Sequence, residues 1–385
     1  MFVRGQRSGK SVVPVLVLLL LIPSIAFSQQ EKPKPKPTPK FLKINGVGAV
    51  TDIITVRMKE KNKVYYGRPL GQDSKRLALL RWDGRITTLP KRDRLEVFSG
   101  GFAPYTNKEL SKRLQKQYGS RYLVQESEHF VVVYPRTKSR KWADQYEAVY
   151  RQFRSYMKKR GITIAEPQFP MIVVVLGSRS EFDRALTGQF TFKRNVLGFY
   201  SRASNRVSTY VSSDPRVERQ VNRFINVTVI HEAIHQIAFN TGFHNRLCVV
   251  PRWMSEGFAM LFESPGFRRD SPDKTVADRV NKSRLEMLKK LFGNGRASGK
   301  LETMIRNDQL FQTNAEVAYA LAWGLSFYLA ETQPENYLKF VVQDGNQNQF
   351  RDYPPSQRVD LFIKSFKLDL DTLEGRLRNF VKGLP

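Results

Sequence analysis

Residues 226–240 read NVTVIHEAIHQIAFN, and they contain two of the four histidines of the chain, with a glutamate directly after the first. On a helix, residues i and i+4 lie on the same face, so His231 and His235 can direct both imidazoles at one ion. Their neighbours are mostly apolar, which indicates a buried helix, and two unpaired imidazoles in a buried helix need a partner. Glu232 lies one position round the helix, where it can hold a water molecule. The stretch therefore predicts a zinc site with an adjacent general base.

A third ligand is expected downstream, because a catalytic zinc usually has three protein ligands and keeps its fourth position for water. Residues 251–264 read PRWMSEGFAMLFES and begin with a proline, which is typical of a helix start. They place Glu256 after His235 at a distance that suits a loop and a returning helix. Glu256 is therefore the expected third ligand of the Zn²⁺ ion.

Together, HExxH at 231–235 and WxxEG at 253–257 resemble the gluzincin group of zinc metallopeptidases, in particular the peptidase MA-like domains. The resemblance extends to the strand before the site, to a hairpin at 198–211 and to the apolar helix at 319–329, which occur in the same order. It covers roughly residues 105–383. The implied activity is hydrolysis of peptide bonds by a zinc-activated water molecule.

The resemblance also implies a role for each site residue. His231, His235 and Glu256 would bind zinc, and Glu232 would be the general base. The oxyanion that forms when water attacks the peptide carbonyl usually needs a hydrogen-bond donor in addition to zinc. The resemblance points to the phenol of Tyr319 as that donor. Alternatively, Tyr319 is an aromatic residue of the core, and another tyrosine donates the hydrogen bond. The competing tyrosines are Tyr200, Tyr210 and Tyr328.

The chain departs from thermolysin-like members one turn after the glutamate ligand. Those members carry there an acid that hydrogen-bonds a ligand histidine, whereas this chain has Met260. Glu263 lies on the same predicted helix face as Glu256 and could supply the missing hydrogen bond. The alternative is that Glu263 is a surface glutamate at a helix end.

The remaining histidines and the single cysteine have simpler interpretations. His244 falls in the loop between the two ligand helices and is expected to be structural. His129 begins an apolar strand and is expected in the core or at a cap. Cys248 is the only cysteine, so it cannot close an internal disulfide. It is expected to be a small buried apolar side chain, and a thiol that approaches the metal is the alternative.

The ends of the chain predict export. Residues 1–28 carry three cations, then an apolar run, then small residues before a cut at Gln29, which is typical of a secretory signal peptide. The apolar run has about half of the roughly 20 residues that a membrane-spanning helix needs. Residues 29–40 alternate lysine with proline and are expected to form an extended linker. The protein is therefore expected in the periplasm, the cell envelope or the extracellular space.

The predicted fold class is α+β with two domains. Residues 41–104 contain short runs of alternating and β-branched residues, with the hairpin turn Asp83-Gly84 between two of them, and predict a small SH3-like or Sm-like β-barrel for binding or scaffolding. Residues 105–385 predict a gluzincin-like metallopeptidase domain, with a mixed sheet and a mainly helical C-terminal part. In that domain we expect the arm 206–211 to be the sheet edge along the cleft. The runs of the barrel are 52–58, 63–68, 76–82, 85–90 and 95–98.

The net charge of the chain bears on which partners it can bind. Lysine and arginine number 64 against 35 acids, a formal net charge of +29. Such a charge attracts polyanions. Export argues against nucleic acid as the partner. We therefore expect an anionic envelope polymer or a membrane surface as a partner, in addition to the peptide or protein substrate. A solvated basic surface without a dedicated partner is the alternative. Two rival functions stay open: a non-catalytic zinc-containing envelope binding protein, and a zinc amidase acting on cell-wall peptides.

Overall fold

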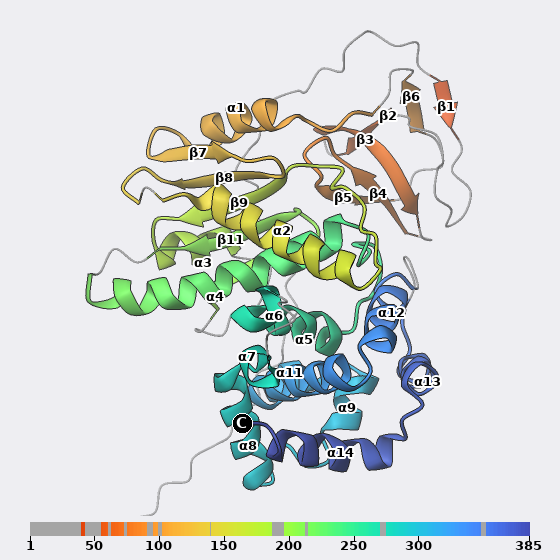
Figure 1. Cartoon of the computed structure of the whole chain (residues 1–385). Coiled ribbons are helices and arrows are strands. Elements are labelled where there is room, and N and C mark those ends of the chain that lie inside the picture. Colours follow the sequence, from red (N-terminus) through yellow and green to blue (C-terminus); the bar gives the residue numbers. More distant parts are fainter. Residues whose placement is uncertain are drawn as a thin grey trace, which may run out of the picture.

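The computed structural model describes most of the chain from residue 40 onward (Figure 1). The predicted signal peptide and nearly all of the predicted linker lie outside the described residues. For 40–42, 55–60, 63–64, 72, 95–98 and 215–225 only the backbone is described. The described residues are 40–42, 55–60, 63–72, 75–90, 95–98, 102–138, 140–186, 196–211, 215–269, 275–347 and 352–385.

The N-terminal strands form one antiparallel sheet in the order β1-β6-β2-β3-β4-β5. The predicted turn Asp83-Gly84 joins β4 to β5, and Gly84 has a φ of 77°, which glycine adopts without strain. Among the described strands β1 and β5 have one neighbour each, so a closed barrel is not seen. The strands are β1 (Lys40–Leu42), β2 (Thr55–Glu60), β3 (Lys63–Gln72), β4 (Arg76–Leu80), β5 (Ile86–Pro90) and β6 (Leu95–Phe98).

A second sheet of mixed direction has the order β10-β11-β9-β8-β7. Its inner strands β8, β9 and β11 run parallel, and β8 and β9 are buried along their whole length, as continuous apolar runs require. The outer strands β7 and β10 are antiparallel to their neighbours. The strands are β7 (Tyr122–Glu126), β8 (Phe130–Pro135), β9 (Met171–Leu176), β10 (Gly198–Ser201) and β11 (Arg206–Tyr210).

The position of β11 corrects the prediction that the arm 206–211 is the sheet edge. β11 pairs with β9 on one side and with β10 on the other, so the edge is β10, the first arm of the hairpin. The period of two that marks a strand does not say which arm of a hairpin pairs inward, because that choice depends on the distant strand β9.

Alternate residues of the second sheet pack on different helices. On β9, Val173 and Val175 join the large core beneath α2 (Trp142–Lys159) and α4 (Pro215–Asn240). Their neighbours on the other face join a smaller core with α1 (Asn107–Tyr118) and α3 (Arg179–Leu186). The sheet is therefore buried on both faces, with the helix that carries HExxH on the large-core side.

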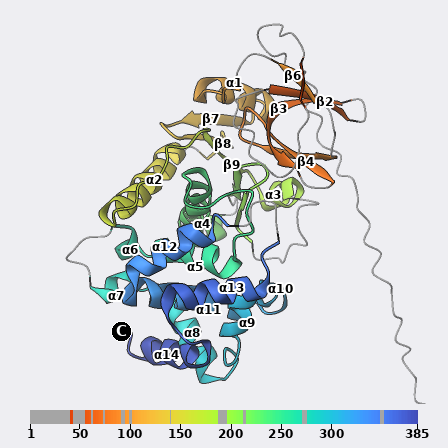
Figure 2. The same cartoon turned by 90° about the vertical axis from the view of Figure 1, so that its right-hand side faces the viewer.

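The C-terminal half is helical, which completes an α+β fold (Figure 2). α5 (Arg252–Glu263) packs along α11 (Ala315–Thr332), and a Cβ on Gly257 would lie 2.4 Å from the carbonyl oxygen of Ala322. Only glycine therefore fits after Glu256 at this crossing. The other helices are α6 (Pro265–Arg269), α7 (Val276–Arg279), α8 (Lys282–Gly293), α9 (Leu301–Arg306), α10 (Leu310–Thr313), α12 (Pro334–Asp344), α13 (Pro355–Phe366) and α14 (Leu370–Lys382).

The two sheets contact each other through the turn between β4 and β5. The backbone N–H of Ile86 donates to the carbonyl of Ala203 at 2.8 Å, in the loop between β10 and β11. Asp83 lies 3.5 Å from Arg206 on β11, and the ring of Phe102 packs edge-on against Phe169. The predicted domain boundary near residue 104 therefore separates two sheets that share a packed interface.

No helix within the described ranges is long and apolar enough to cross a membrane.

Candidate metal centre

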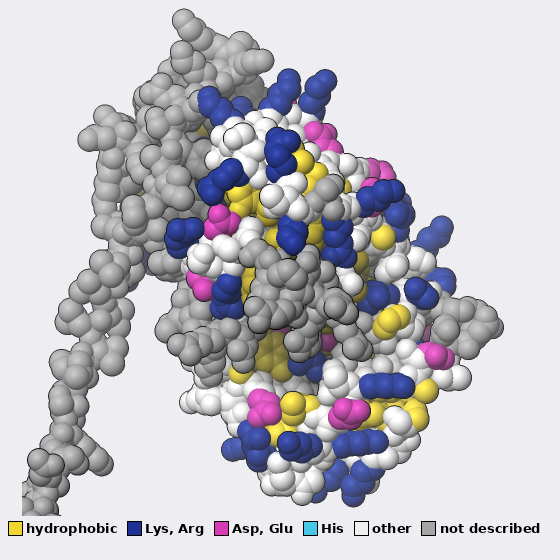
Figure 3. Space-filling model, turned by 90° about the vertical axis from the view of Figure 1, so that its left-hand side faces the viewer, with side chains coloured by type: hydrophobic (Ala, Val, Ile, Leu, Met, Phe, Trp, Pro, Cys, Tyr) yellow, Lys and Arg dark blue, Asp and Glu magenta, His cyan; other side chains and the backbone are white. Residues whose placement is uncertain are grey.

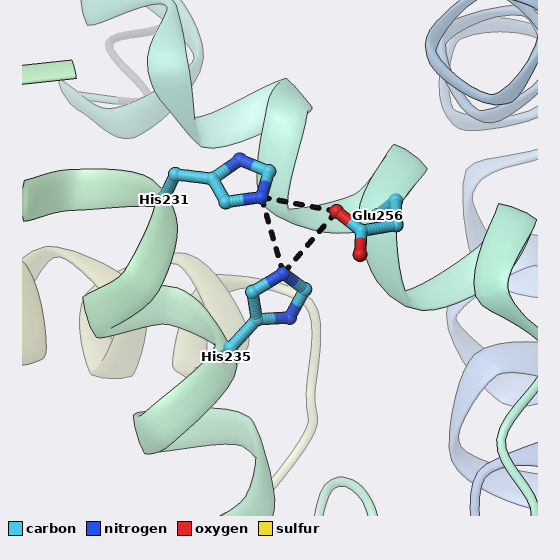
Figure 4. Close-up of side chains that lie close together, drawn as sticks. All are labelled: His231, His235 and Glu256. Carbon is cyan, nitrogen blue, oxygen red and sulfur yellow. Dashed lines mark hydrogen bonds and ion pairs between the residues drawn. The ribbon is translucent and has the colours of Figure 1, made fainter. Parts of the chain in front are cut away.

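Three predicted ligands converge between α4 and α5 (Figure 4). The Nε2 atoms of His231 and His235 lie 3.1 Å apart. The Oε2 atom of Glu256 lies 3.1 Å from the first of them and 3.5 Å from the second. The structure thus brings together, from two helices, one atom each of His231, His235 and Glu256.

The spacing of these three atoms suits a small cation. Tetrahedral bonds of roughly 2.0–2.1 Å to zinc would separate any two ligand atoms by about 3.3 Å. The two imidazoles turn the same ring nitrogen toward each other, and one shared proton cannot satisfy both nitrogens and the carboxylate of Glu256 at once. A divalent cation at their common point would satisfy all three atoms, so the donor set fits Zn²⁺.

Burial and charge at the site act in opposite directions. The side chains of His231, His235 and Glu256 are at most 15% exposed. Burial disfavours the charged form of His231, but hydrogen bonds with Glu256 and Glu263 outweigh it and raise the pKa of His231 to about 10. Burial likewise opposes ionisation of Glu256, yet the two histidines hold its pKa well below the usual range. The carboxylate is therefore charged and available to a cation.

Glu232 lies beside this group and outside it. Burial raises the pKa of Glu232, and the charges of the two histidines oppose that shift. The backbone of Tyr200, on the edge strand β10, also opposes the rise in the pKa. A Cβ on Gly198 would come within 3.0 Å of Glu232 Cγ, so the edge strand lies directly against this glutamate. The arrangement gives a carboxylate with a raised proton affinity at the edge of the sheet.

Glu263 contacts the ring nitrogen of His231 that points away from the other ligands. Its Oε1 lies 3.0 Å from Nδ1 of His231, and its Oε2 accepts from Nδ2 of Asn281 at 2.8 Å. Arg284 approaches the same carboxylate at 3.6 Å, and the Glu263 side chain is only 5% exposed. With zinc bound, the hydrogen bond from Nδ1 to Glu263 would hold the ring of His231 with its Nε2 directed at the common point.

Asn281 and Arg284 were not predicted from the sequence as site residues. Asn281 is the N-cap of α8, where its side-chain oxygen accepts from the backbone N–H of Arg284. The pattern of an asparagine before an apolar periodic run could have marked the helix start. It could not have shown that the amide nitrogen of the same side chain reaches Glu263, because α5 and α8 are separated by two short helices and a loop.

Tyr319 lies near both glutamates of the site. The charge of Glu256, followed by burial, raises its pKa, and Glu232 adds to the effect. Its phenol oxygen is 3.4 Å from Nη2 of Arg252, the first residue of α5. A neutral phenol in this place can donate a hydrogen bond, as an oxyanion donor must.

The three competing tyrosines have other surroundings. The phenol of Tyr200 donates to Oδ1 of Asn205 at 2.9 Å. The rings of Tyr210 and Tyr328 pack against Phe182 and Phe380, with centroids 5.2 Å apart in each pair. A further tyrosine was missed: Tyr146 on α2 is buried, and after burial the charge of Glu232 is the main cause of its raised pKa.

His244 lies apart from the metal group. It is buried among phenylalanine rings, Phe239 and Phe243 among them, with ring centroids about 5 Å away. Burial lowers its pKa to about 3, so it is neutral. Cys248 is also buried, and burial raises the pKa of its thiol. Neither residue belongs to a metal-competent group within the described ranges.

His129 belongs to a second group of possible ligands, together with Glu128 and Glu147. Its Nδ1 lies 2.7 Å from Glu147, and its Nε2 lies 3.2 Å from Glu166. Its ring also stacks on Tyr150, with centroids 4.0 Å apart. Each nitrogen of this imidazole therefore already faces a carboxylate.

Residues 225–350 match the protein family described as "Protein of unknown function (DUF1570)". The matched segment contains all three candidate ligands together with Glu232 and Tyr319. No curated protein matches the chain.

Proposed function

We propose that this protein is an exported zinc-dependent metallopeptidase with a gluzincin-like catalytic domain. The observation that carries the proposal is the convergence of His231, His235 and Glu256 on one point, with the carboxylate of Glu232 beside that point and outside the ligand set. A purely structural zinc site has no use for such a carboxylate, whereas hydrolysis needs a general base there.

Zinc, when bound, would lower the pKa of a water molecule toward ~7 and polarise the scissile carbonyl. Glu232 takes the proton of that water molecule and passes it to the leaving amine. Tyr319 donates a hydrogen bond to the developing oxyanion, and Glu263 holds the ring of His231 in position.

The edge strand β10 is the natural place for the substrate backbone. It is the outermost strand of its sheet and lies against Glu232. An extended peptide can add to such an edge through main-chain hydrogen bonds, which recognise the backbone and not the sequence. The substrate class is therefore an extended peptide or protein segment.

The basic surface provides a second binding function. Lysine and arginine side chains are spread over the face shown in Figure 3, without one compact patch. A dispersed positive charge suits a long anionic envelope polymer or a membrane surface better than a small anion. The N-terminal sheet is proposed as a binding or scaffolding unit.

The change Glu232→Gln tests the proposal. Glutamine keeps the size of the side chain and removes the proton acceptor, so zinc content and melting temperature should stay close to wild type. Hydrolysis of a library peptide that the wild type cleaves should fall by at least ~10². The matched control is Glu335→Gln, at an 86%-exposed side chain on α12, which should leave hydrolysis unchanged.

Equal cleavage by the wild type and the Glu232→Gln variant would remove Glu232 from the mechanism. A zinc-loaded wild type that cleaves no peptide in the library would favour the non-catalytic binding protein. Cleavage restricted to cell-wall peptides would favour the zinc amidase.

A further inference from the structure

Arg252 lies on the same helix as the candidate ligand Glu256, with its guanidinium beside the phenol of Tyr319. It is the first residue of α5, one helical turn before Glu256 and on the same helix face. Its Nη2 lies 3.4 Å from the phenol oxygen of Tyr319. Its guanidinium carbon lies 4.7 Å from the ring centre of Phe311, so the side chain is held between two aromatic residues.

The contacts of Arg252 leave its charge without a carboxylate partner. Within the described part of the chain no acidic side chain lies at ion-pair distance from its guanidinium. Asp308 is the nearby acid, and it accepts from the backbone N–H of Arg252 and from the guanidinium of Arg358, each at 3.0 Å. Asp308 thus caps the helix and pairs elsewhere. Among the described residues this half-buried guanidinium has no carboxylate in direct contact, and a carboxylate of a ligand would supply one.

The neighbours of Arg252 show where that ligand would lie. Arg252 lies one helical turn before the candidate ligand Glu256 on α5, and its Nη2 lies beside the phenol of Tyr319 on α11, the helix that packs along α5. A group that reaches the guanidinium is therefore close to the bond that is cleaved. Guanidinium groups bind carboxylates through two parallel hydrogen bonds, a geometry that other cations do not reproduce.

We infer that Arg252 recognises a carboxylate of the substrate next to the cleaved bond, so that the enzyme prefers peptides that are acidic at this position. The inference rests on the proposed function and adds the substrate class. The carboxylate has two possible sources, the C-terminus of a short peptide and the side chain of an acidic residue.

The test measures binding to the zinc-loaded full chain by calorimetry. The probes are short peptide hydroxamates, which bind through zinc and need no turnover. One pair differs only in a C-terminal carboxylate or carboxamide, and a second pair differs only in a glutamate or glutamine side chain. In at least one pair the wild type should bind the acidic member ~10-fold tighter or more, and that pair identifies the source of the carboxylate.

Arg252→Gln should reduce this preference to less than about 3-fold, and Arg252→Lys should keep part of it. The cap from Asp308 uses the backbone of residue 252, so both variants should fold and keep zinc. The matched control Arg306→Gln removes an arginine on α9 that pairs with Glu302, and it should leave the preference intact.

Three results would overturn the inference: equal binding of both members of each pair by the wild type, an undiminished preference in Arg252→Gln, or an equal loss for acidic and neutral probes. The last would mean that Arg252 only supports Tyr319. Failure of the wild type to bind zinc would instead refute the proposed function, and this inference with it.

Discussion

Among the described residues two groups of histidine and carboxylate side chains could hold a metal ion, and their geometry differs. In the candidate metal centre, two imidazoles share one carboxylate, and the Nε2 atoms of His231 and His235 lie 3.1 Å apart. In the second group, His129 lies 2.7 Å from Glu147, its other ring nitrogen lies 3.2 Å from Glu166 outside the group, and Glu128 is the third possible ligand.

The difference lies in how each group balances donors and acceptors. Around His129 each ring nitrogen has its own carboxylate, so the group is complete without an ion. Around Glu256 two imidazoles turn their Nε2 atoms toward one carboxylate oxygen and toward each other, an arrangement that a bound cation would satisfy. The ligand atoms of both groups lie close together, and the two groups differ in whether each ring nitrogen already has its own carboxylate.

Asp344 provides a third case, a buried carboxylate with neither a histidine nor an ion. It accepts a hydrogen bond from the phenol of Tyr353, and its Oδ2 has no partner among the described residues. Burial raises its pKa to about 7. Here a proton neutralises the buried charge.

The largest expected effect comes from removing both histidine ligands. His231→Ala combined with His235→Ala should weaken zinc binding by at least ~10⁴-fold, because each ligand contributes on the order of 3 kcal/mol. Titration against a competing chelator measures the affinity. His129→Ala serves as the comparison and should bind zinc like the wild type. If it lost zinc as well, the distinction between the two groups would fail.

The second prediction concerns the proton on Asp344. Its pKa rises from 3.8 to about 7 on folding, so its contribution to stability is fully present below pH ~4 and is lost as the pH rises through ~7. Asp344→Asn removes this dependence. Relative to the wild type, the variant should gain on the order of 3–4 kcal/mol in free energy of unfolding between pH 4 and pH 8. Urea unfolding at the two pH values measures the gain, and parallel curves for both proteins would contradict it.

The third prediction concerns the support of His231. Glu263→Gln places an amide nitrogen against Asn281 and removes the charge that holds Nδ1 of His231, so zinc affinity should fall by about 10–100-fold. Glu286→Gln, an exposed residue on α8, is the matched control. Unchanged affinity in Glu263→Gln would show that the ring of His231 is held by packing alone.

The smallest expected effect comes from changing His129 in the second group. His129→Gln can keep a hydrogen bond to one carboxylate and loses the other, so the free energy of unfolding should fall by about 1 kcal/mol. Zinc content should not change. Chemical denaturation and metal analysis of the same sample test both statements, and any loss of zinc would link the two groups.

Local patterns in the sequence predicted much of the fold and of the site. A spacing of four residues on one helix was enough to bring His231 and His235 together, because helix geometry is the same in every protein. The pair Asp83-Gly84 predicted a turn because a two-residue hairpin turn needs a positive φ, which few residue types other than glycine adopt readily. Gly84 has such a φ. The apolar runs of β8 and β9 predicted buried strands.

Only the tertiary structure decided which elements meet. The edge strand proved to be β10 because β11 pairs with the distant β9, and the predicted barrel appeared as an open sheet for the same kind of reason. The bond from Asn281 to Glu263 and the contact of Arg252 with Tyr319 likewise join residues from different helices. Period and propensity act over a few neighbouring residues, whereas these contacts depend on how the whole core packs, and no local pattern carries that information.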